Sequence, residues 1–198
     1  MDWMNFAREI VSEVNRKVKR VYWTNEEIDK FFGRRSVKEI LDNGTTCFMN
    51  PCLDLTLVSS YFISSEKIPH QFVIEEHLPT AEFDFNRLHF VIEFNNSDKN
   101  YAINYKRANE VYIVEGGYNG REDIPMASMI KIPGLIINPY KNLNENLRYP
   151  NLEELTKDKF RGYSLEKNLN RLKQDNSKEN YNLYKQKYGD GFEIITGL

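Results

Sequence analysis

Cysteine is scarce in this sequence: the 198 residues include two, Cys47 and Cys52. Small secreted domains held together by disulfides carry many more, so the chain is not of that class. The first stretch, MDWMNFAREIVSEVNRK, carries charges where a signal peptide needs an unbroken apolar core. We therefore expect a cytoplasmic protein whose two cysteines are free thiols.

Long apolar runs and an excess of one charge are also missing. The longest nearly apolar stretch, LDLTLVSSYFI, is far shorter than the ~20 residues of a membrane-spanning helix. The 27 basic and 29 acidic residues leave a net charge of −2, which gives no strong field toward nucleic acid or an anionic membrane. We expect neither nucleic acid nor a membrane as a partner.

The first part of the chain predicts helices. Apolar residues recur every three or four positions across 2–22, the period of an amphipathic helix. Two further short helices are expected, one over 24–32 and one over 36–41. Each begins with Thr or Ser followed three residues later by Glu, which is the spacing of a capping box.

A fourth helix is predicted to begin at Asn50 and Pro51, since Asn is a common N-cap and proline fits the first helical position. The residues that follow, CLDLTLVSSYFI, are apolar nearly all round, which is typical of a central, buried helix. Cys52 would be its second residue, at the positive end of the helix dipole, which lowers the pKa of a thiol. An inert core cysteine is the alternative interpretation, and this segment by itself favours it.

After this helix the pattern changes to strands. Four segments rich in Val, Ile, Phe and Tyr are separated by turn-like residues: 70–77, 87–94, 100–106 and 110–116. Strands without helices between them indicate an antiparallel sheet, so the fold class is α+β, with helices before the sheet. The stretch 129–140 is either another strand or a buried loop.

The chain becomes polar beyond Pro150. One or two helices are expected there, with Leu165, Leu169 and Leu172 forming a thin apolar stripe. We therefore divide the chain into an α+β domain over 1–145 and a polar helical extension over 146–198 that packs on it.

A thiol nucleophile needs a histidine to take its proton and a third group to orient that histidine. Of the three histidines, His77 precedes Leu-Pro and is expected in an exposed turn. His89 lies within RLHFVIEF, and Asn104 lies fifteen residues later within NYAINYK. Side-chain alternation allows His89 and Asn104 to project from one face of a hairpin. Cys52, His89 and Asn104 are therefore candidate catalytic residues.

This order of residues resembles the transglutaminase-like domain, a branch of the papain-like cysteine enzyme superfamily. Its members have a Cys at the start of a buried helix, about sixteen residues before a G-I-P turn into a strand. A strand H-a-W/F-x-E follows, and an Asp or Asn lies about fifteen residues beyond the His. Here Cys52 precedes KIPHQFV, His89 begins HFVIEF, and Asn104 lies in YAINYK. The similar region is roughly 36–116.

Two features depart from the family pattern. Asn104 stands where Asp is commoner, and an amide accepts the imidazole N–H but cannot offset an imidazolium charge. The Gly commonly found just before the family's Cys is replaced by Pro51. The backbone N–H of Cys52 is a natural first oxyanion donor, and the sequence assigns no second one.

The resemblance implies a papain-like fold and thiol-dependent acyl transfer through a thioester. In that chemistry Cys52 is the nucleophile, His89 first accepts and then donates the proton, and Asn104 orients His89. A hydrolase, namely a cysteine peptidase or amidase acting on peptide or protein amides, is expected first. A transferase with an amine acceptor shares the same intermediate. No cofactor or metal is expected, and the sequence does not indicate the oligomeric state.

Other interpretations are left open by the sequence. The same fold without catalysis would serve as a protein-interaction module. A metal site of Cys47, Cys52 and two histidines falls outside the usual C-x2–4-C spacing. A disulfide between the two cysteines would act as a redox lock on the nucleophile. If the register differs, Cys47 takes the catalytic role.

Overall fold

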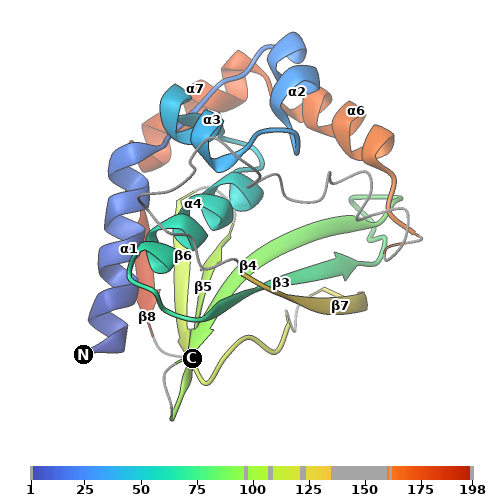
Figure 1. Cartoon of the computed structure of the whole chain (residues 1–198). Coiled ribbons are helices and arrows are strands. Elements are labelled where there is room, and N and C mark those ends of the chain that lie inside the picture. Colours follow the sequence, from blue (N-terminus) through green and yellow to red (C-terminus); the bar gives the residue numbers. More distant parts are fainter. Residues whose placement is uncertain are drawn as a thin grey trace.

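The computed structural model describes residues 2–95, 98–106, 109–120, 124–134, 160 and 162–196 (Figure 1). Its fold is α+β. The elements in chain order are α1 (Trp3–Lys17), β1 (Lys19–Val21), α2 (Asn25–Phe31), α3 (Val37–Asn43), β2 (Thr45–Cys47), α4 (Cys52–Ser65), β3 (His70–His77), β4 (Arg87–Asn95), β5 (Asn100–Tyr105), β6 (Glu110–Glu115), β7 (Met126–Pro133), α6 (Leu165–Asp175), α7 (Lys178–Tyr188) and β8 (Glu193–Thr196). None of the helices in these ranges is long and apolar enough to cross a membrane.

The N-terminal helices follow the predicted pattern with one correction. The helix predicted over 2–22 ends at Lys17, because Val18 is extended and residues Lys19–Val21 pair in parallel with β2. Both predicted capping boxes are present. At the start of α2, the side chain of Thr24 accepts from the backbone N–H of Glu27, and the side chain of Glu27 accepts from the backbone N–H of Thr24. Ser36 and Glu39 make the same pair of hydrogen bonds at the start of α3.

The main sheet has six described strands in the order β7-β3-β4-β5-β6-β8. The four predicted strands are confirmed as β3 to β6, and β7 occupies part of the predicted 129–140 stretch. Neighbouring strands from β7 to β6 are antiparallel, as expected. The prediction of a wholly antiparallel sheet is wrong at one edge, because β8 pairs in parallel with β6.

Helices α1 and α4 cover one face of the sheet (Figure 1). Helix α4 is central and buried, as its apolar residues predict, and packs on β3, β4 and β5. Fully buried side chains such as Leu55, Ile63, Ile74 and Ile92 fill the layer between them. Each contributes about 1.5–3 kcal/mol to folding by leaving water.

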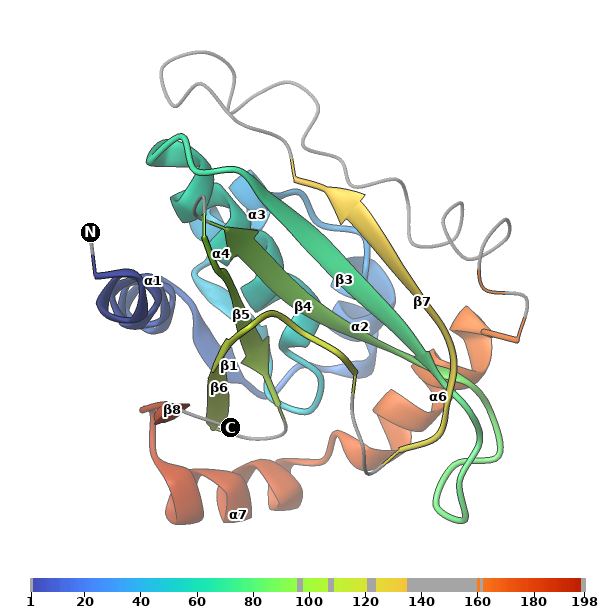
Figure 2. The same cartoon turned by 90° about the horizontal axis from the view of Figure 1, so that it is seen from below.

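The opposite face of the sheet has a small apolar cluster and several buried polar groups. Val73, Val91 and Ala102 pack there against Tyr118, which lies just after β6. Figure 2 looks onto this face, and no described helix crosses it. Helices α1 and α4 and the apolar core therefore lie on one side of the sheet, and a mixed polar layer lies on the other.

The described part of the predicted extension contains helices α6 and α7 and also β8, a strand that the sequence analysis missed. The predicted stripe of Leu165, Leu169 and Leu172 packs against the cluster around Trp23. Buried Arg20 donates hydrogen bonds to the carbonyl oxygens of Asp190 (3.0 Å) and Gly191 (2.8 Å), just before β8. The proposed boundary between residues 145 and 146 lies outside the described residues.

A buried ion pair fixes the first turn of α4. The guanidinium of Arg35 pairs with the carboxylate of Asp54 and donates to the carbonyl oxygen of Thr45 at 2.8 Å. The hydroxyl of Thr46 donates to the same Asp54 oxygen at 2.7 Å, and Arg35 lies 4.6 Å from the centre of the Trp23 ring. This arrangement, the Arg35 clamp, ties α4 to β2 and to the start of α3.

The clamp predicts a large stability loss for Asp54→Asn. The substitution leaves the Arg35 guanidinium buried without an opposite charge, which costs about 3–5 kcal/mol. Urea unfolding followed by circular dichroism measures the loss. Asp42→Asn is the control, because it breaks an exposed ion pair with Lys38, and such pairs contribute little. Equal unfolding midpoints for Asp54→Asn and the wild type would contradict the role of the clamp.

Candidate active site

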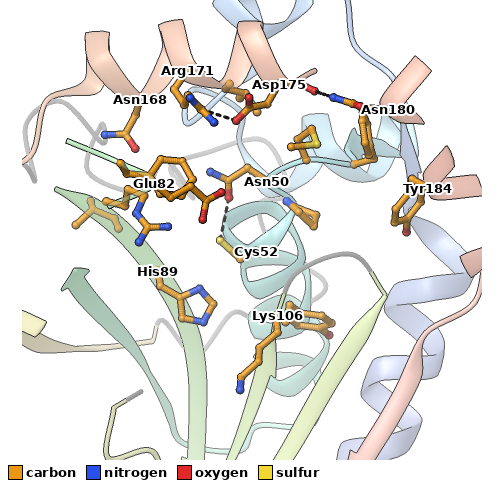
Figure 3. Close-up of a pocket in the computed structure, with 18 of the residues that line it drawn as sticks. Asn50, Cys52, Glu82, His89, Lys106, Asn168, Arg171, Asp175, Asn180 and Tyr184 are labelled. Atoms are coloured by element: carbon orange, nitrogen blue, oxygen red, sulfur yellow. Dashed lines mark hydrogen bonds and ion pairs between the residues drawn. The ribbon is translucent and has the colours of Figure 1, made fainter. Parts of the chain in front are cut away.

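A cavity of about 570 Å³ lies between the end of the sheet and helices α6 and α7. Cys52 at the start of α4 and His89 on β4 both line it. Figure 3 shows these two residues on the side of α4 and the sheet, while Asn168, Arg171 and Asp175 project from α6 opposite. Two predicted catalytic residues, far apart in sequence, therefore share one cavity.

Cys52 is the first residue of α4 rather than the second. Pro51 occupies the N-cap position and makes no side-chain capping bond, so the predicted cap at Asn50 is wrong. The amide oxygen of Asn50 instead accepts a hydrogen bond from the Cys52 thiol, with a sulfur–oxygen distance of 3.2 Å. This contact holds the thiol at the cavity wall.

The start of α4 takes the place of a neighbouring strand beside β4. In the described strands, the ladder between β4 and β5 stops at Ile92 and Ile103. Beyond that point the carbonyl oxygen of Phe90 accepts from the hydroxyl of Thr56 at 3.3 Å. The backbone N–H of Phe90 faces the sulfur of Cys52. Both polar backbone groups of Phe90 are thus used by α4, which places the thiol beside the residue that follows His89.

His89 and Asn104 are joined by a hydrogen bond. Nε2 of His89 lies 2.7 Å from the amide oxygen of Asn104, and both side chains are buried. An amide oxygen can only accept, so the proton of the neutral ring is on Nε2. Nδ1 is then the basic nitrogen of the ring. With this tautomer, any proton that the ring takes up goes to Nδ1.

The thiol of Cys52 is protonated near neutral pH when His89 is neutral. Burial raises the pKa of Cys52 to about 11, although backbone N–H groups of Phe90 and Leu53 act in the opposite direction. The predicted lowering of this pKa by the helix dipole is therefore outweighed by desolvation. Formation of a thiolate requires a group that accepts the proton.

A second buried polar cluster lies next to His89 and was missed by the sequence analysis. The fully buried carboxylate of Glu75 accepts from Nε2 of His77 at 3.0 Å and from the hydroxyl of Tyr118 at 2.8 Å. His77, predicted in an exposed turn, is buried, and its ring stacks on that of His89 with centroids 5.9 Å apart. The alternation of HQFVIEEH puts Glu75 and His77 on one face, but their position opposite His89 depends on strand register.

The other candidate groups lie elsewhere. His70 is held by Ser60 (2.7 Å) and the carbonyl oxygen of Ile68 (3.0 Å), which is a structural role. Cys47 lies in β2 rather than in a loop, donates to Asn176 at 3.6 Å and does not line the cavity. Burial raises its pKa to about 12. Both cysteines are free thiols. Within the described ranges, no three His, Cys, Asp or Glu side chains are grouped as metal ligands.

The remaining walls of the cavity come from a loop and from the C-terminal helices. The loop between β3 and β4 contributes Phe83. The centre of the Phe83 ring lies 4.0 Å from the guanidinium carbon of Arg87. Arg171 on α6 pairs with Asp175 at 2.7 Å and lies 5.2 Å from the same Phe83 ring. The sequence analysis missed the contribution of α6 and α7, because nothing in their polar pattern indicates what they face.

Comparisons of the chain with protein-family models, with curated proteins and with solved structures find no match. The resemblance of the Cys52, His89 and Asn104 segments to the transglutaminase-like domain therefore stands on the quoted residues. What the protein does has to be inferred from the chemistry of the cavity and its neighbouring groups.

Proposed function

We propose that the protein is a thiol-dependent acyl-transfer enzyme, a cysteine peptidase or amidase with a papain-like or transglutaminase-like core. The observation that carries the proposal is the His89–Asn104 hydrogen bond at the wall of the cavity that also contains Cys52. The bond fixes the tautomer that makes Nδ1 the base. A thiol, a base and an orienting amide are the three groups that nucleophilic thiol catalysis requires.

The first half of the reaction forms a thioester. His89 Nδ1 takes the proton from the Cys52 thiol, and the thiolate attacks the carbonyl carbon of an amide. The tetrahedral intermediate collapses when the C–N bond breaks, and the imidazolium of His89 gives its proton to the leaving amine. Asn104 keeps its hydrogen bond to Nε2 throughout, so the ring does not rotate away.

The second half releases the acyl group. His89 takes a proton from a water molecule as the water oxygen attacks the thioester carbon. The C–S bond then breaks to release the carboxylic acid, and the imidazolium of His89 returns its proton to the sulfur, which regenerates the thiol and the neutral ring. An amine that attacks in place of water would give transfer instead of hydrolysis. The backbone N–H of Cys52 belongs to the first turn of α4, whose N–H groups have no partner within the helix, and supplies one oxyanion donor.

Alkylation by iodoacetamide tests the proton acceptor. We expect Cys52 to be labelled at pH 7 much faster than Cys47, because His89 can take the proton of Cys52. In His89→Gln that acceptor is lost, so burial keeps the thiol protonated at pH 7 and labelling of Cys52 should become slow. Mass spectrometry of timed samples measures both rates. Equal labelling of Cys52 in the wild type and in His89→Gln would favour the non-catalytic interaction module.

Acyl-enzyme formation tests the chemistry without knowledge of the substrate. p-Nitrophenyl acetate is expected to give a burst of nitrophenol and an acetyl group on Cys52, followed by slow turnover. Cys52→Ala should abolish the burst. Cys47→Ala is the matched control and should retain it, because Cys47 lies outside the cavity. Asn104→Ala should slow the burst about tenfold or more, since loss of the orienting acceptor leaves the ring free to take the wrong tautomer. A burst that persists in Cys52→Ala contradicts the proposal.

A further inference from the structure

A carboxylate is buried directly beside the proposed base. Glu75 is fully buried on β3, and its register partner on β4 is His89. Directly opposite residues of an antiparallel pair have Cβ atoms about 4.5–5.5 Å apart, so their side chains are neighbours. Val73 and Val91, one pair further along the same face, are both buried in the apolar cluster there.

The carboxylate is held in its charged form. Burial alone raises the pKa of Glu75, but the hydrogen bonds from His77 and Tyr118 and the nearby charge of His89 outweigh burial and keep the pKa below its usual range. The interaction is reciprocal: if a positive His89 stabilises the Glu75 carboxylate, the carboxylate stabilises a positive His89 by the same free energy.

The negative charge of Glu75 compensates for the neutral Asn104, which stands where the family commonly has Asp. Asn104 orients the His89 ring but is neutral, so it cannot offset the imidazolium that forms when the thiol loses its proton. The site is also buried, where an uncompensated charge is costly. A carboxylate near the ring is what such a site requires.

We propose that Glu75 is a positioning residue that stabilises the imidazolium of His89 and so favours the thiolate–imidazolium pair with Cys52. The proposal rests on the proposed function for its catalytic meaning, but the coupling between Glu75 and His89 is a property of the folded protein. Tyr118 and His77 hold the Glu75 carboxylate in place, and His77 also stacks on the His89 ring.

Other charged and titratable groups near His89 come from several elements. Among the described residues they are Cys52 from α4, Glu75 and His77 from β3, exposed Glu82 from the loop after β3, Arg87 from β4, Lys106 after β5 and Tyr118 after β6. Arg87 and Lys106 oppose a positive His89, but both are partly exposed and lie over aromatic rings, at 4.0 Å and 4.1 Å. Water screens exposed charges, so the fully buried Glu75 has the larger effect.

The test is an NMR titration of His89 in full-length protein carrying Cys52→Ala, which removes the thiolate as a second source of negative charge. We expect His89 to titrate above its ordinary value of about 6.5. In the same background Glu75→Gln should lower that titration by about one to three pH units, the effect of an opposite charge in contact. A His89 that titrates at or below about 6.5 in the Cys52→Ala protein overturns the proposal without any substitution at Glu75.

Glu93→Gln is the matched control. Glu93 is a buried carboxylate on the same face of the sheet, but it pairs with Lys131 at 2.9 Å and lies four residues from His89 on β4. We expect it to leave the His89 titration nearly unchanged. An equal fall in Glu93→Gln and Glu75→Gln would show a general loss of packing and overturn the specific role of Glu75.

Alkylation of Cys52 in the wild-type background separates this inference from the proposed function. Glu75→Gln should slow labelling at pH 7 by about tenfold or more and shift its pH profile upward, because less imidazolium is available to hold the thiolate. Fast wild-type labelling that Glu75→Gln does not change overturns the inference and leaves the enzyme proposal standing. Slow labelling in the wild type together with a Glu75-dependent His89 titration supports the coupling and removes the enzyme proposal.

Discussion

The site depends on what replaces β5 beside Phe90. Backbone N–H and C=O groups in the interior need partners. Strand β5 supplies them to β4 from the pair Asn95 and Asn100 to the pair Ile92 and Ile103. Where that ladder stops, the first turn of α4 supplies them through Cys52 and Thr56. The same requirement that normally holds a sheet together therefore brings a helix N-terminus, and its thiol, to the edge of a strand that carries a histidine.

A buried site of this kind has to balance two opposing effects. Exclusion of water favours the neutral thiol, as the raised pKa of Cys52 shows, and by itself it also disfavours a positive charge on a buried imidazole. Charge separation becomes favourable only when fixed groups stabilise both products of the proton transfer. Helix α4 and the N–H of Phe90 face the sulfur, whereas Asn104 and Glu75 face the ring. The Arg35 clamp holds the N-terminal end of α4 in place, and because Arg35 is paired with Asp54 it adds no net charge near the site.

Sequence reasoning was most successful where the determinants are local. The two capping boxes, the four strands and the apolar helix were readable from neighbouring residues. The order and spacing of Cys52, His89 and Asn104, with the family resemblance, nominated the site. Reasoning failed where partners are distant in sequence. Glu75 meets His89 only through the register that the 78–86 loop sets, and β8 pairs with a strand about eighty residues earlier. The end of α1 was missed because β1 forms only when β2 is present.

The position of α6 and α7 in the chain has a consequence for how the protein is made. Ribosomes release a chain from its N-terminus, and early segments begin to fold before later ones emerge. Cys52, His89 and Asn104 all precede the helices that form the far wall of the cavity. The three proposed catalytic residues are therefore synthesised before the helices that form the far wall, and the cavity is enclosed only after α6 and α7 have emerged.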